Sequence, residues 1–142
     1  MACPYFNAVN PKSRASDSRY AMLPLGDAWD GTCLAAQEPA NAPDETTLLN
    51  CCNMGYAREC CPRFPAGDGP DAVRFTIAGG DERHVRLYYV LERDHHPWAH
   101  GPLEFSTGRD EFVEPPSSNI VERLGRAYVR SYLRRKAEAS AA

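Results

Sequence analysis

The chain has 142 residues, a formal net charge of −3 at pH 7, 43% hydrophobic residues and 25% charged residues. These values are typical of a small globular protein, and we expect residues 1–142 to form a single domain. The negative charge argues against a nucleic-acid binder, and no apolar run is long enough to cross a bilayer. The N-terminus lacks the basic and apolar regions of a signal peptide, so we expect a cytoplasmic protein.

Residues 1–70, which we call the cysteine lobe, are rich in proline and turn signals, and we expect loops with one short helix. The helix is predicted from about Pro43 to Tyr56 or Arg58. Proline suits a first helical position, and the two acidic residues that follow it suit the positive end of the helix dipole. Leu48, Cys52 and Tyr56 recur at a spacing of four and predict one buried face.

Residues 71–138 have a different pattern, which predicts a small antiparallel sheet. Residues 72–77 alternate between apolar and polar, Gly79 and Gly80 indicate a hairpin turn, and residues 84–92 alternate again. A third short strand is predicted at 103–106, after a loop over 94–101. The sequence therefore favours a sheet of about three strands.

The last element is a long helix predicted from about Ile120 to Ala137, with Asn119 as its N-terminal cap. Its buried stripe is expected to comprise Ile120, Leu124, Ala127, Tyr128 and Ser131 or Tyr132. The predicted fold class is α+β: this helix packs on the sheet, and an irregular cysteine lobe is organised by a metal centre.

All six cysteines lie in the first 61 residues, at positions 3, 33, 51, 52, 60 and 61. In a reducing cytoplasm such a group is more often metal-binding or catalytic than disulfide-bonded. The lobe also has few apolar residues to offset the entropy of ordering its loops, which favours a bound metal as its organiser.

Four of the cysteines are predicted to ligate a [4Fe–4S] cluster: Cys3, Cys33, Cys52 and Cys61. Adjacent cysteines rarely bind one metal together, so one member is taken from each vicinal pair. Cys52 shares the apolar helix face, and Cys61 precedes a proline as in ferredoxin motifs. Such a cluster would serve electron transfer or structural support in a larger system, and we do not expect a stand-alone enzyme.

Three alternatives remain open for the cysteines. The same thiolates could hold zinc in a non-catalytic protein-interaction module, although no pair has the usual zinc-knuckle spacing. They could instead be free buried or redox-active thiols. In an enzyme hypothesis, Cys60 or Cys51 is the nucleophile and His96 the base; the simpler interpretation of His95, His96 and His100 is a surface turn.

Arginines recur on the last helix at spacings of three and four residues, at Arg123, Arg126, Arg130 and Arg134. This basic face is either a solvated surface that complements the helix dipole or a docking site for an acidic partner. The solvated surface is the favoured interpretation of this face, and docking of a protein is the second one. As partners of the chain we expect a protein, and neither a membrane nor a nucleic acid.

Overall fold

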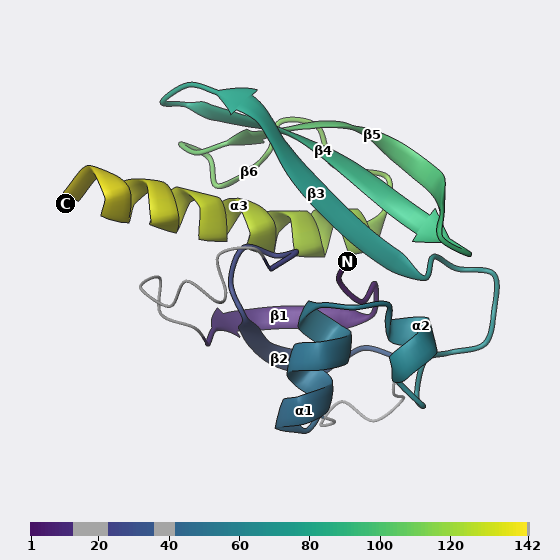
Figure 1. Ribbon diagram of the computed structural model, residues 1–142. Helices are drawn as coiled ribbons and strands as arrows, with labels where there is room; N and C mark the ends of the chain where they lie inside the picture. Colours follow the sequence, from purple (N-terminus) through teal and green to yellow (C-terminus); the bar gives the residue numbers. More distant parts are fainter. Residues whose placement is uncertain (13–22, 36–41, 142) are drawn as a thin grey trace.

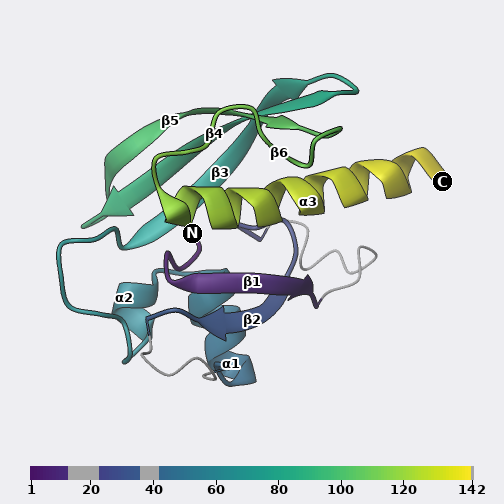
Figure 2. The same ribbon diagram turned by 180° about the vertical axis from the view of Figure 1, so that it is seen from behind.

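The computed structural model describes residues 1–12, 23–35 and 42–141. Its C-terminal helix α3 lies between two antiparallel sheets, one of four strands and one of two (Figures 1 and 2). The predicted α+β class with antiparallel pairing and a long C-terminal helix is confirmed. The predicted count of about three strands is wrong: the larger sheet has four strands, and the cysteine lobe contains two more.

The larger sheet has the strand order β3-β4-β5-β6. Its first hairpin follows the predicted alternation, with Phe75 opposite Tyr89 and Val73 opposite Leu91. The first and third strands are longer than the predicted ranges 72–77 and 103–106. After the third strand the chain turns back and adds a fourth. The strand bounds are Ala72–Gly80 for β3, His84–Arg93 for β4, His96–Ser106 for β5 and Glu111–Phe112 for β6.

The predicted loop over 94–101 is mostly strand. Only Asp94 and His95 form the turn, with positive φ values of 51° and 62°, and β5 begins at His96. The loop was predicted because proline and glycine, here Pro97 and Gly101, usually interrupt strands. Strand β5 has only the two-residue β6 on its outer side, and an edge strand tolerates a proline without losing a ladder hydrogen bond.

The cysteine lobe contains a two-stranded sheet that the sequence did not predict. Strand β1 (Phe6–Pro11) pairs with β2 (Trp29–Cys33), and Cys33 lies opposite Phe6. The strands approach closely at Gly31, where an added Cβ would lie 1.9 Å from Asn7 O. Gly31 is therefore needed for the pairing of β1 with β2.

The helix predicted from about Pro43 to Tyr56 or Arg58 is broken into three short pieces, the last of which ends at Cys60. Helix α1 covers Glu45–Thr47, the π-helix η2 covers Leu48–Asn53, and α2 covers Ala57–Cys60. The start is close to the prediction, since Asp44 caps the segment by accepting a hydrogen bond from Thr47 N over 2.7 Å. Gly55, with φ of 82°, separates η2 from α2.

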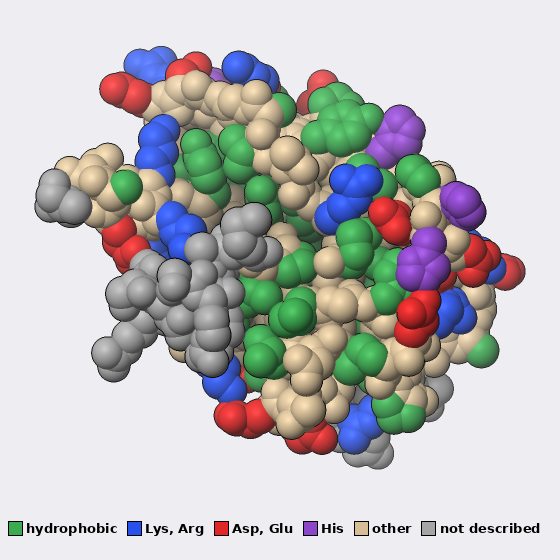
Figure 3. Space-filling model, in the orientation of Figure 1, with side chains coloured by type: hydrophobic (Ala, Val, Ile, Leu, Met, Phe, Trp, Pro, Cys, Tyr) green, Lys and Arg blue, Asp and Glu red, His purple; other side chains and the backbone are tan. Residues whose placement is uncertain are grey.

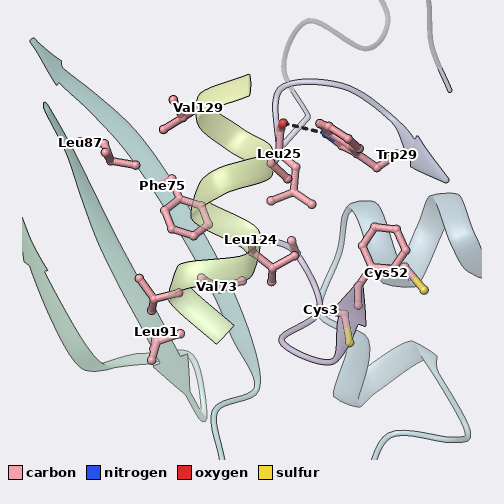
Figure 4. Close-up of a cluster of buried hydrophobic side chains, with 14 of the residues drawn as sticks. Cys3, Leu25, Trp29, Cys52, Val73, Phe75, Leu87, Leu91, Leu124 and Val129 are labelled. Atoms are coloured by element: carbon pink, nitrogen blue, oxygen red, sulfur yellow. Dashed lines mark hydrogen bonds between the residues drawn. The ribbon is translucent and has the colours of Figure 1, made fainter. Parts of the chain in front are cut away.

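Helix α3 covers Asn119–Ala141. Its cap is Ser118, whose Oγ accepts from Val121 N over 3.4 Å, one residue before the predicted Asn119. The predicted single stripe is too narrow, because α3 is covered on two sides. Figure 4 shows Val129 on the side of the larger sheet and Leu124 on the side of Leu25, Trp29 and Cys3.

One hydrophobic cluster joins the two halves of the chain, since it contains Phe6 and Trp29 from the lobe together with Phe105 and Leu124. At Gly125 the helix comes so near the sheet that an added Cβ would lie 3.1 Å from the Phe112 ring. Within the described residues, no helix has the length and apolar character needed to span a membrane.

Candidate functional site

A cavity of about 150 Å³ in the cysteine lobe is lined by five of the six cysteines. Phe6 and Ala57 supply apolar wall, and Asp44 and Arg63 lie among its polar lining residues. The cysteines that line it are Cys3, Cys33, Cys51, Cys52 and Cys61. All four residues predicted as ligands therefore reach one place, although they come from separate elements.

Backbone hydrogen bonds hold these elements together. Cys3 N donates to Cys52 O over 3.1 Å, which fixes the N-terminal segment to η2. Cys33 is the last residue of β2, and Cys61 follows α2, where its N–H donates to Ala57 O over 2.7 Å. The side-chain positions are thus set by a strand end, a π-helix and a helix end.

Asn53 is the residue that joins η2 to β2, and the sequence analysis did not identify it. It is 1% exposed. Its Oδ1 accepts from Trp29 N over 2.7 Å, and its Nδ2 donates to Trp29 O and Leu48 O over 2.9 Å each. A buried asparagine with three satisfied bonds holds the wide turn of η2 that carries Cys51 and Cys52.

The two remaining cysteines, Cys51 and Cys60, form a disulfide. Cys3, Cys33, Cys52 and Cys61 carry free thiols. The expectation that every thiol is reduced is therefore wrong. The bond connects η2 to α2 and places Cys51, which is 6% exposed, beside the cavity, while Cys60 is exposed on the surface.

The predicted metal centre is contradicted. In residues 1–12, 23–35 and 42–141, no group of three or more His, Cys, Asp or Glu side chains is arranged to hold a metal ion. The [4Fe–4S] cluster on Cys3, Cys33, Cys52 and Cys61 is thus a wrong prediction, as is the zinc alternative. The lobe was expected to need a metal because it has few apolar residues, whereas a two-stranded sheet and a disulfide organise it.

The cavity favours neutral thiols. Burial, reinforced by the neighbouring thiols Cys33 and Cys61, raises the pKa of Cys3 to about 12. Burial, with the same neighbours and Cys3, also raises the pKa of Cys52 to about 12. Because the thiolate is the nucleophilic form of a cysteine, the raised pKa values make Cys3 and Cys52 weak nucleophiles at neutral pH.

Helix α2, which carries Cys60, is anchored by the larger sheet. Arg58 forms an ion pair with Asp71, whose side chain is 1% exposed. His95 stacks on Tyr56 with ring centroids 4.0 Å apart, and its Nε2 contacts Glu59. The β4–β5 turn thereby holds the outer end of the disulfide in place.

The predicted histidine cluster is divided by the structure. His95 lies in the turn against α2, whereas His96 and His100 belong to β5, where His100 Nδ1 contacts the Tyr88 hydroxyl. Figure 3 shows histidine side chains mixed with acidic ones along this side of the molecule. The enzyme hypothesis loses its nucleophile, because Cys51 and Cys60 are bonded to each other.

The arginines of α3 have partners within the chain. Arg123 donates to the carbonyl oxygens of Pro4 and Phe6, and Arg126 donates to Glu122. Arg134 forms an ion pair with the buried Asp27. Whether this face also binds a partner stays a prediction.

No family model, curated protein or solved structure matches the chain. Its function therefore has to be inferred from the geometry of the site.

Proposed function

We propose that this protein is a thiol–disulfide redox protein and that Cys51–Cys60 is its reactive couple. The observation that carries the proposal is the asymmetry of this disulfide: Cys60 is an exposed residue of α2, whereas Cys51 is buried and lines a cavity together with the four free cysteines. Redox-active thiols were one of the alternatives left open by the sequence. The reaction partner is a dithiol, either a protein or a small molecule.

An incoming thiolate attacks the disulfide at Cys60, because Cys60 is exposed and Cys51 is buried. Attack on Cys60 Sγ forms a mixed disulfide with the partner, and the electron pair of the broken bond leaves with Cys51 Sγ, which takes a proton from solvent. The partner's second thiol then loses its proton, and its sulfur attacks the partner's first sulfur. Cys60 leaves as a thiolate and is protonated, so two thiols on the partner become a disulfide.

Two features of the surroundings bear on this exchange. Cys60 Sγ lies 3.6 Å from Asn50 O, which can accept the thiol hydrogen once the disulfide is reduced. The cavity beside Cys51 contains no thiolate at Cys3 or Cys52, because burial keeps those thiols protonated. No fixed negative charge from these two groups opposes the departing Cys51 thiolate.

The test is to equilibrate the folded protein in glutathione buffers of graded potential and to count free Cys51 and Cys60 by differential alkylation and mass spectrometry. We expect the oxidised fraction to follow the buffer while the circular dichroism stays native. A disulfide that is reduced only when the protein unfolds would show that its role is structural.

Two single variants make the test specific. Cys51→Ser leaves the exposed Cys60 free and should form a glutathione adduct, whereas Cys60→Ser leaves the buried Cys51 and should form little. Equal adducts in both variants would contradict attack at Cys60. Iron with acid-labile sulfide in stoichiometric amounts, measured after purification without oxygen, would overturn the proposal altogether.

A further inference from the structure

A groove runs between α3 and β1, and none of the residues that line it is a cysteine. It consists of two adjoining cavities of about 270 and 200 Å³, and both are lined by Trp29 and Arg130. Both ribbon views show α3 running alongside β1 (Figures 1 and 2). The groove is the place on which the basic side chains of α3 converge.

Four arginines of α3 line this groove, against two carboxylates. The carboxylates are already engaged, since Glu122 binds Arg126 over 2.9 Å and Asp27 forms an ion pair with Arg134. The groove therefore has an excess of positive charge. The arginines are Arg123, Arg126, Arg130 and Arg134.

Arg123 and Arg130 are the source of this excess. Arg123 donates to the neutral carbonyl oxygens of Pro4 and Phe6, over 2.8 and 3.3 Å, so these bonds place its guanidinium without cancelling its charge. Arg130 is 52% exposed, and its contact with Asp110, itself 65% exposed, is 3.4 Å long. An exposed pair of this kind is worth about 0–1 kcal/mol, so a ligand carboxylate can replace Asp110 at little cost.

The length of the groove fits an extended peptide. At about 1.5 Å per residue, the helix rises about 16 Å from Arg123 to Arg134. An extended chain covers this distance with about five residues at about 3.3 Å each, and alternate side chains point to the same side. The opposite wall, on β1, is apolar at Ala8, Val9 and Pro11 and polar at Asn7, and Val9 is 52% exposed.

We propose that this groove binds an extended acidic segment of a partner protein, with acidic side chains toward α3 and apolar side chains toward β1. A nucleic acid fits less well, because single strands need exposed aromatic rings for base stacking. The aromatic residue that lines both cavities, Trp29, is 4% exposed. The proposal is independent of the thiol chemistry.

The experiment measures binding of a fluorescein-labelled peptide of about eight residues that alternates glutamate and valine, with the intact protein, by fluorescence anisotropy. We expect micromolar binding that weakens with added salt. Arg130→Glu should weaken it at least about tenfold. Arg83→Glu, in the exposed turn between β3 and β4, changes the net charge equally and should leave the affinity within about twofold.

Two comparisons complete the test. Arg130→Glu should keep the thermal midpoint of the wild type, because its partner contact is weak and exposed. A lysine–valine peptide of the same length should not bind. Equal loss in the two charge variants, no binding by the wild type, or tighter binding of a single-stranded thymidine oligonucleotide would each overturn the proposal.

Discussion

Trp29 Nε1 donates a hydrogen bond to Ser131 Oγ over 3.1 Å, although 102 positions separate the two residues in the chain. The same N–H lies 3.3 Å from Leu25 O, the contact drawn as a dashed line in Figure 4. Both side chains are buried, with Trp29 4% and Ser131 1% exposed. This bond fastens the two-stranded sheet of the cysteine lobe to the second side of α3.

Removing the hydroxyl in Ser131→Ala should lower the free energy of unfolding by about 1 kcal/mol, since the indole N–H keeps only its longer bond to Leu25 O. Urea denaturation followed by tryptophan fluorescence measures the change. Ser140→Ala is the control, because Ser140 is exposed near the end of α3 and its hydroxyl donates to Lys136 O within the same helix. Equal effects of the two substitutions would show that the Trp29–Ser131 bond adds nothing.

Gly31 should tolerate no side chain. Its added Cβ would lie 1.9 Å from Asn7 O, which is backbone and can move only if β1 and β2 separate. We expect Gly31→Ala to cost more than about 2 kcal/mol of stability. Gly108→Ala, where an added Cβ meets nothing within 4 Å, should be near neutral. Thermal unfolding of the two variants compares them directly, and a stable Gly31→Ala protein would contradict the close strand approach.

Asp71 should make stability depend on acid pH. Burial opposes its ionisation, but the Asp94 N–H and the Arg58 guanidinium outweigh burial, and the pKa falls below its usual value of 3.8. The stability that the ionised Asp71 contributes is therefore complete above about pH 3.8 and is lost as the pH falls through the lowered pKa of the folded state. At pH 7, Asp71→Asn should lose about 2 kcal/mol, since it leaves Arg58 without its ionic partner.

The measurement is the free energy of unfolding from pH 2 to pH 7 for the wild type and Asp71→Asn. The two curves should converge in acid and separate above the pKa. Asp68→Asn is the matched control, since Asp68 is fully exposed and its bond to Arg93 is 3.2 Å long. A constant gap between wild type and Asp71→Asn at every pH would contradict the role of its charge.

The free thiols should differ in alkylation rate. With pKa values near 12, Cys3 and Cys52 hold roughly one thiolate in 10⁴ molecules at pH 8, and they are 8% and 6% exposed. Iodoacetamide followed by peptide mass spectrometry should therefore label Cys33 and Cys61 first. In urea the four rates should become similar. Labelling of Cys3 or Cys52 as fast as Cys61 in the native protein would show that the cavity does not protect them.

The candidate site was only partly open to prediction from the sequence. The two cysteines chosen from the vicinal pairs, Cys52 and Cys61, have free thiols, and the two left out form the disulfide. Helical spacing indicated Cys52, because it lies on the apolar face. The role given to them, metal ligation, is contradicted. The buried Asn53 and Asp71 left no local signal, since each acts through partners far away in the chain.

Local patterns determined the hairpin of β3 and β4 and the helix α3, because alternation and helical periodicity are written within one short segment. Contacts between distant segments decided the rest. Pairing with β4 made residues 96–101 part of a strand despite the proline at 97. Burial of α3 on two sides followed from the pairing of β1 with β2, which are well separated in the sequence. Cys51 and Cys60 are nine positions apart, and the elements that carry them are held by contacts outside this segment: Asn53 of η2 bonds to Trp29, and Arg58 of α2 pairs with Asp71.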